Sequence, residues 1–164
     1  MERPPEIGIV AFAFGTPASS KINNRIARTA EQAALTRRNP VFTQEEITFR
    51  SSPIDVTRIA GTEVPTLRIA REAVAWAQKR KLHYICISCA LPHLKRCKRD
   101  LLNAIREAGA TIEVSTFFDV ENSTMDEWFD PASTQKRVHS ANTWWPREIA
   151  LLLMPFWLYK IFAS

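Results

Sequence analysis

Apolar residues along the chain fall either into unbroken runs or into runs with helical spacing. An unbroken apolar run covers residues 6–17, EIGIVAFAFGTP, and a Gly-Thr-Pro turn signal closes it. Such a run predicts a strand that is buried on both faces of a parallel sheet. Residues 83–90, HYICISCA, predict a second buried strand, and residues 110–118, ATIEVSTFF, predict a further one.

Three segments with apolar residues at helical spacing separate these strands. They cover residues 23–38, 66–81 and 93–109. The first follows two serines that can cap a helix, and either Thr62 or Thr66 starts the second. Pro92 precedes the third, at a position where its missing N–H costs nothing, and Gly109 ends it.

The remaining segments carry weaker signals. Within residues 41–61, the triplets ITF at 47–49 and IDV at 54–56 predict two short strands. Residues 119–130 are acidic and irregular. A solvated loop is favoured there over a cation site, because the spacing and central glycine of an EF-hand loop are missing. A C-terminal apolar helix is expected over residues 143–163.

Strands and helices alternate along the chain, and this alternation predicts an α/β fold. We expect a three-layer sandwich with a mainly parallel sheet, formed by a single domain over residues 1–164. Ligands of such sheets bind beyond the carboxyl ends of the strands, in the loops that enter the next helices. The search for a site is therefore directed to residues 15–20, 63–66 and 88–96.

The three cysteines raise the question of a metal or redox site. Cys86 and Cys89 form a C-x-x-C pair. Cys89, His93 and Cys97 recur every four residues. A zinc knuckle or a redox pair needs a turn or helix start that brings the thiols together, whereas Cys86 lies inside an apolar strand. We therefore predict no metal site and expect the cysteines to serve as small apolar residues.

Basic residues open the helix that follows this strand. His93, Lys95 and Arg96 lie in its first turn, where backbone N–H groups and the helix dipole favour an anion. His93 and Arg96 are three residues apart, so they share one face of the helix. A guanidinium matches the geometry of phosphate or carboxylate, and an imidazole can move a proton near neutral pH. The alternative, an exposed basic surface, stays open.

Composition and charge narrow the class of protein. The chain has 164 residues, 46% of them hydrophobic, a formal net charge of +5 and a pI of about 9.4. This charge favours anionic partners, but no aromatic residues alternate with the basic ones, so we expect no nucleic-acid partner. The four glycines leave no room for the usual glycine-rich nucleotide loops. Without a secretory signal pattern or a membrane-spanning run, a cytoplasmic location is the expectation.

The C-terminal sequence WWPREIALLLMPFWLYKIFAS, residues 144–164, is apolar nearly all round. A helix without a polar face is buried in the core, pairs with another chain, or lies against lipid. Its Trp and Tyr residues suit an interface. Core packing, a homodimer contact and membrane-surface association all stay open.

The strand ICISCALPH and the helix LKRCKRDLLNAIREAG after it resemble the SanA/YdcF-like family of bacterial proteins of unknown function. Members of that family carry a His and an Arg three residues apart at the start of this helix, which His93 and Arg96 match. Arg25 is similar to the family's arginine at the start of the first helix, and Arg147-Glu148 to an Arg-Glu pair near the C-terminus. The resemblance implies a Rossmann-like fold. One short match, IVAFAFGTP, is similar instead to ferrochelatase-like proteins.

Together these features predict a Rossmann-like protein that binds a small anionic ligand, phosphate-bearing or nucleotide-like, at the carboxyl ends of the strands. The expected ligand-binding residues are Gly15, Thr16, Arg25, Thr66, Ser88, His93 and Arg96. If the protein is an enzyme, a hydrolase or a transferase, His93 is the expected general acid or base. No cofactor is identified. The alternative is a non-catalytic interaction or scaffold protein that uses its C-terminal apolar segment for dimer or membrane-surface contact.

Overall fold

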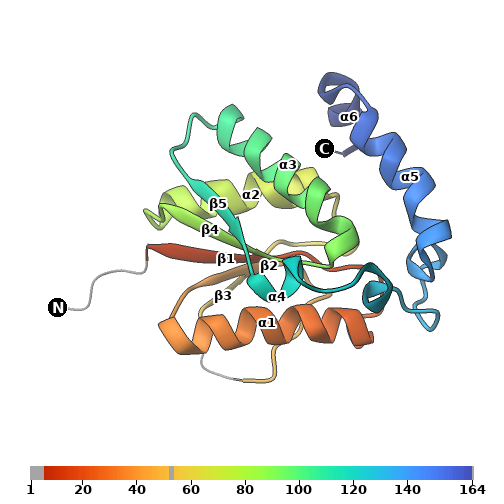
Figure 1. Ribbon diagram of the computed structural model, residues 1–164. Coiled ribbons are helices and arrows are strands. Elements are labelled where there is room, and N and C mark those ends of the chain that lie inside the picture. Colours follow the sequence, from red (N-terminus) through yellow and green to blue (C-terminus); the bar gives the residue numbers. More distant parts are fainter. Residues whose placement is uncertain (1–5, 52–53, 164) are drawn as a thin grey trace.

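The computed structural model describes residues 6–51 and 54–163, and a parallel sheet forms its centre (Figure 1). The strands are β1 Ile7–Ala11, β2 Val41–Thr43, β3 Val56–Arg58, β4 Tyr84–Ser88 and β5 Glu113–Thr116. Their order is β3-β2-β1-β4-β5, and each pairing is parallel. The chain moves outward from β1 to β3 and then crosses back to β4, which is the strand order of a doubly wound, Rossmann-like sheet.

Helices cover both faces of this sheet, α1 on one side and α2 and α3 on the other (Figure 1). The helices are α1 Lys21–Arg37, α2 Thr66–Lys79, α3 Leu91–Glu107, α4 Phe118–Glu121, α5 Ala141–Leu153 and α6 Phe156–Ala163. Two short 3-10 helices are η1 Met125–Trp128 and η2 Lys136–Val138. The predicted α/β sandwich with a parallel sheet is confirmed.

The central strand β1 is apolar on both sides because helices cover both faces of the sheet. Ile9 and Ala11 pack in the cluster beneath α1, whereas Val10 and Phe12 pack in the cluster beneath α2 and α3. All four are fully shielded from solvent. An unbroken apolar run buried on two faces is the pattern from which the sequence predicted this strand.

The long helices begin and end at the local signals in the sequence. Ser20 caps α1, because its Oγ accepts a hydrogen bond of 3.2 Å from the backbone N–H of Asn23. Pro92 lies in the first turn of α3, where no intrahelical donor is needed. Gly109 follows that helix in the left-handed region, with a φ of +59°. Of the two threonines considered for α2, Thr66 opens it.

The segment between α1 and α2 differs from its prediction. Residues 47–49 form no strand, and β2 is the earlier triplet Val41–Thr43. Ile47 is apolar because it packs, fully buried, in the cluster beneath α1, and not because its backbone pairs in the sheet. β3 begins at Val56, the last residue of the second predicted triplet.

The last third of the chain also differs from its prediction. The expected single helix over residues 143–163 is instead two helices, α5 and α6, with a break at Met154-Pro155. Pro155 has no N–H to continue α5, and it holds Met154 in an extended conformation, with a ψ of 131°. The acidic residues 119–130, expected as an irregular loop, contain most of α4 and all of η1.

The helices α5 and α6 lie beyond the carboxyl end of the sheet, near the start of α3 (Figure 1). Trp144 joins the core beneath α1, and Tyr159 packs on Leu67 of α2. Other side chains of the two helices stay in contact with solvent, among them Leu153 at 79% exposed and Trp157 at 68%. Among residues 6–51 and 54–163, every helix is too short or too polar to span a bilayer.

Candidate functional site

A pocket of about 190 Å³ lies at the carboxyl edge of the sheet, enclosed by the strand-end loops and by the C-terminal helices. The loop after β1 contributes residues 13–16, the loop before α2 contributes residues 63–65, and α2 contributes its first residue, Thr66. The polar side chains that line the pocket are Thr16, Gln44, Glu46, Glu63, Thr66, His93, Arg96, Gln135, Arg137, Arg147 and Tyr159. The structure therefore brings Gly15, Thr16, Thr66, His93 and Arg96, five of the predicted residues, to one place.

Gly15 and Thr16 join the first loop to the C-terminal part of the chain. Gly15 has a φ of +80°, and a Cβ there would lie 2.7 Å from Cγ2 of Val138, so a larger residue would displace η2. The backbone oxygen of Thr16 accepts a hydrogen bond of 2.7 Å from Ser133, and the Thr16 and Thr134 hydroxyls are 2.6 Å apart. These contacts hold residues 133–138 against the pocket.

Arg25 and Ser88 do not reach the pocket. The guanidinium of Arg25 pairs with Glu127 at 2.9 Å and stacks over Trp128, 4.0 Å from the ring centre. Ser88 is fully buried, and its hydroxyl donates to the carbonyl of Ile26 in α1 at 2.9 Å. Both side chains therefore tie α1 to its neighbours, and their predicted contact with a ligand has no geometric support.

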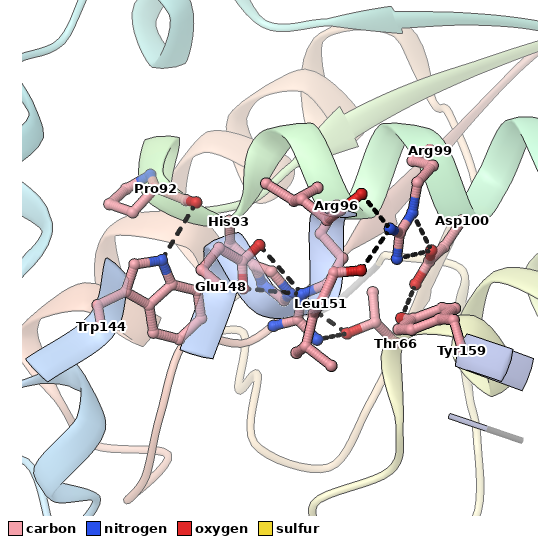
Figure 2. A network of polar contacts seen from close by, with 11 residues as sticks. Thr66, Pro92, His93, Arg96, Arg99, Asp100, Trp144, Glu148, Leu151 and Tyr159 are labelled. Carbon is pink, nitrogen blue, oxygen red and sulfur yellow. Dashed lines mark hydrogen bonds and ion pairs between the residues drawn. The ribbon is translucent and has the colours of Figure 1, made fainter. Parts of the chain in front are cut away.

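Arg96 makes an ion pair between α3 and α5 (Figure 2). Its Nε lies 3.0 Å from a carboxylate oxygen of Glu148, and its Nη1 donates to Oγ1 of Thr66 at 3.2 Å. Glu148 is 1% exposed and Arg96 is 8% exposed. Burial opposes the charge of Arg96, but the Glu148 carboxylate and other neighbouring groups, Tyr159 among them, together outweigh this effect, so the pKa of Arg96 is raised. The guanidinium predicted to bind the ligand is already neutralised by a carboxylate of the chain.

A second buried ionic group lies one turn further along α3 (Figure 2). Asp100 is fully buried, and its carboxylate accepts hydrogen bonds from Tyr159 of α6 and from the guanidinium of Arg99. Arg99 also donates to the carbonyl of Leu151 at 2.8 Å, at the end of α5. Burial raises the pKa of the Tyr159 hydroxyl. This group fixes the break between α5 and α6 against α3.

His93 lies between these polar contacts and three aromatic rings. Its Nε2 is 3.2 Å from Oγ1 of Thr66, and its ring centre is 5.7 to 6.3 Å from those of Phe12, Phe14 and Trp144. Its Nδ1 is buried and has no hydrogen-bond partner in the described part of the chain. Burial lowers the His93 pKa well below its ordinary value, and neighbouring arginines lower it further. The imidazole is therefore neutral at neutral pH.

Two arginines from the C-terminal part complete the cationic side of the pocket. Arg137 of η2 and Arg147 of α5 both line it. Within the described residues, no hydrogen bond or ion pair of 4.0 Å or less joins either guanidinium to a carboxylate. Burial lowers the Arg137 pKa, and the charges of Arg147 and Arg96 lower it further. Arg147 was part of the family resemblance, whereas no sequence signal pointed to Arg137.

Two of the three cysteines, Cys89 and Cys97, pack in the apolar core. All three are free thiols, with Cys89 and Cys97 buried and Cys86 half-buried. Cys86 lines a hollow beside α1 with Ser115, while Cys89 packs in the cluster beneath α2 and α3, so the two point to opposite faces. Burial raises the pKa of both Cys86 and Cys97. Over residues 6–51 and 54–163, no group of three or more His, Cys, Asp or Glu side chains is placed to hold a metal ion.

Comparisons with known proteins add little to this site. No protein-family model matches the chain, and no curated protein matches it. A solved structure of the universal stress protein from Archaeoglobus fulgidus in complex with dAMP has 16% sequence identity and a TM-score of 0.38. The match covers 67% of this chain and 96% of that one. A likeness of this size carries no functional information, and the SanA/YdcF-like resemblance stays a prediction.

Proposed function

We propose that the pocket at the carboxyl edge binds a small ligand through a phosphate group or a similar oxyanion. The observation that carries this proposal is the pair of guanidiniums, Arg137 and Arg147, that line the pocket and have no carboxylate partner among residues 6–51 and 54–163. A guanidinium presents a planar set of N–H donors that matches a phosphate, and two of them can hold one phosphate from two sides.

The electrostatics of the pocket support the same ligand. Arg96, Arg137 and Arg147 are the charges that act on His93, and all three are cationic. Burial and then the charges of Arg147 and Arg96 lower the pKa of Arg137, and the carboxylates of Glu63 and Glu148 offset only part of this effect. An anion between Arg137 and Arg147, whose side chains are both exposed, would offset part of the repulsion between the guanidiniums because opposite charges attract.

The roles of the individual residues follow from their contacts. Arg137 and Arg147 bind the anion, and Arg96 positions His93 through the hydroxyl of Thr66. The SanA/YdcF-like resemblance is compatible with this arrangement, since His93, Arg96 and Arg147 are among the residues that carry it. A nucleotide is one form of the ligand, since its phosphate would meet the same two arginines.

Calorimetric titration with methyl phosphate tests the proposal. Arg137→Gln and Arg147→Gln should each weaken binding about tenfold or more, because each loses a charge-assisted hydrogen bond. Arg25→Gln is the matched control, since that arginine pairs with Glu127 away from the pocket. Absence of binding to the wild type, or equal binding by all four proteins, would contradict the proposal.

A reaction at this site would involve His93. A neutral imidazole can accept or donate a proton, which suits hydrolysis or group transfer on a phosphorylated substrate. Incubation of the wild type with a panel of phosphate esters tests for turnover, with release of the alcohol as the readout. His93→Gln should abolish any turnover while methyl phosphate still binds, and retained turnover in this variant would exclude His93 as the acid or base.

A second candidate function rests on the exposed apolar side chains of α5 and α6. Ile149, Leu153, Trp157 and Ile161 follow one another at intervals of four residues and are between 48% and 79% exposed. Apart from the buried Glu148, the charges on these two helices are Arg147, which is exposed, and Lys160, which is half-buried and pairs with Glu107 at 3.5 Å. A two-fold dimer would bring this surface against its own copy and like charges together, whereas an anionic lipid surface complements it.

Sedimentation with vesicles of phosphatidylcholine and phosphatidylserine tests this second function. Trp157→Ser should reduce binding to mixed vesicles, whereas Leu35→Ser, which removes an exposed apolar residue of α1, should leave binding unchanged. Equal binding by both variants contradicts a lipid role. The wild type could instead fail to bind vesicles but show a molecular mass that rises with protein concentration. If Trp157→Ser abolishes that rise, the surface is a contact between two copies of the chain.

A further inference from the structure

The acidic side of the pocket forms a wall built from three loops. Glu46 accepts the backbone N–H of Glu63 at 2.6 Å with one carboxylate oxygen and the side-chain amide of Gln44 at 3.1 Å with the other. Gln44 in turn accepts the backbone N–H of Ala13 at 3.1 Å. Glu46 is buried and both of its oxygens have donors, so its role is to fix the position of Glu63.

Glu63 differs from Glu46 because it keeps free acceptor capacity. Its side chain is exposed and lines the pocket, and its carboxylate accepts a hydrogen bond from the side-chain amide of Gln135. A carboxylate offers about four acceptor positions, most of which stay available here. The backbone of Glu63 is in the left-handed region, with a φ of +52°. Such a conformation in a non-glycine residue is unfavourable by itself, and here the hydrogen bond from the backbone N–H of Glu63 to the Glu46 carboxylate holds it.

Gln135 supplies a second unused acceptor on this wall. Its Oε1 is buried and has no donor in the described residues, while its Nε2 is bonded to Glu63. A buried acceptor without a donor is unfavourable, and a donor from a ligand would remove that penalty. Glu63 and Gln135 therefore add free acceptor positions to the wall of the pocket that they both line.

We infer that the ligand carries hydrogen-bond donors, hydroxyl or ammonium groups, next to its anionic group. This inference rests on the proposed binding of an anion by Arg137 and Arg147 and adds the chemistry of the rest of the ligand. The negative charge of Glu63 acts on Arg137, so the two poles of the pocket are close together. A bare dianion would be repelled by Glu63, whereas a phosphate with a donor a few atoms away satisfies both poles.

Three phosphate esters of similar length test whether the ligand needs a donor, and whether that donor is a hydroxyl or an ammonium group. Propyl phosphate has none, glycerol 3-phosphate has two hydroxyls, and 3-aminopropyl phosphate has an ammonium group. In calorimetric titrations of the wild type, at least one of the latter two should bind about tenfold or more tightly than propyl phosphate, since a hydrogen bond to a charged acceptor changes affinity by roughly this factor. The order of the two tells whether the donor is a hydroxyl or an ammonium group.

Glu63→Met removes the acceptor oxygens at nearly constant length and should abolish this preference, so that the three esters bind with equal affinity. Glu72→Met, at an exposed carboxylate on α2, is the matched control and should retain the preference. Affinities of the three esters for the wild type that agree within about twofold would overturn the inference, as would a preference that survives in Glu63→Met.

The proposed anion site and this inference fail in different ways. If propyl phosphate binds and Arg147→Gln weakens it, but the three esters bind alike, only the donor requirement is wrong. If none of the three esters binds the wild type, both the anion site and the donor requirement are wrong.

Discussion

Arg96 and Arg147 lie at the same edge of the sheet, yet their surroundings differ in kind. Arg96 is buried between α3 and α5 and is neutralised by Glu148. Arg147 is exposed at the pocket, and no ion pair in the described residues neutralises it. The first arginine joins two helices, and the second has charge available for a ligand. Both residues are arginines near a strand end. They differ because a carboxylate of the chain pairs with Arg96, and we therefore assign Arg96 a structural role and Arg147 a binding role.

The same difference separates the carboxylates of the two regions. Glu148 and Asp100 are buried, and each is held by an arginine of α3. Glu63 is exposed, and within the described residues its carboxylate accepts a hydrogen bond from the amide of Gln135 alone. The α3–α5–α6 junction is thus a satisfied ionic network, and the pocket beside it has unused donors on one side and unused acceptors on the other. Four substitutions probe the comparison, from the largest expected effect to the smallest.

Glu148→Ala should have the largest effect on stability, because it leaves the Arg96 charge buried without a partner. We expect a loss of about 3 to 5 kcal/mol in the free energy of unfolding, measured by urea denaturation. The double variant Arg96→Met with Glu148→Leu should recover most of that loss, since it removes both charges and fills the space. A single variant as stable as the wild type would contradict a structural role for the pair.

Tyr159→Phe should destabilise the protein by about 1 to 3 kcal/mol, because the buried Asp100 carboxylate loses one of its donors. Tyr84→Phe is the control, since Tyr84 is partly exposed at the start of β4. The two variants are compared by thermal and urea unfolding. Equal stability of the two variants would mean that the contact between α6 and α3 contributes little.

His93 should make stability depend on pH. Its pKa is lowered in the folded state, so the unfolded chain binds a proton below about pH 6.5 that the folded chain does not. The contribution of neutral, buried His93 to the free energy of unfolding is therefore fully present above about pH 6.5. It is lost as the pH falls, by up to about 1.4 kcal/mol per pH unit. The slope of the unfolding free energy between pH 6.5 and 5 should be smaller in His93→Gln. The exposed His83→Gln serves as control, and identical slopes in all three proteins would contradict the assignment.

Arg147→Gln should have the smallest effect on stability, within about 0.5 kcal/mol, because Arg147 forms no ion pair within the part of the chain that the structure describes. Loss of the cation next to Arg137 would even relieve some repulsion. Methyl phosphate binding should nevertheless fall about tenfold or more. A large loss of stability without a change in phosphate binding would assign Arg147 to the structural group.

The elements that sequence predicted correctly depend on local signals. An apolar run marked β1, and a serine cap and helical spacing marked α1. The strand predicted at residues 47–49 was wrong. Ile47 is an apolar loop residue that packs in the core, and a sequence pattern does not distinguish such a residue from one in a strand. Pro155 was visible in the sequence, and its effect on the helix is the ordinary one, so the break between α5 and α6 was predictable.

The site was less predictable because its residues come together through contacts that are distant in sequence. His93 and Arg96 were found from their place at a helix start, but the partner of Arg96 is 52 residues away and cancels its charge. Arg137 lies in a segment without periodicity. Its position depends on the Thr16–Thr134 contact, which joins residues 118 apart. No local sequence pattern indicates the pairing of Arg96 with Glu148 or the position of Arg137.

The arginine side chains themselves give the most direct test of this account. In a protein labelled with ¹⁵N-arginine, the Nε resonances can be followed while methyl phosphate is added. We expect the resonances of Arg137 and Arg147 to shift with the ligand, and that of Arg96 to stay in place because its Nε is bonded to Glu148. A shift of the Arg96 resonance with no change at Arg137 and Arg147 would contradict the assignment of structural and binding arginines.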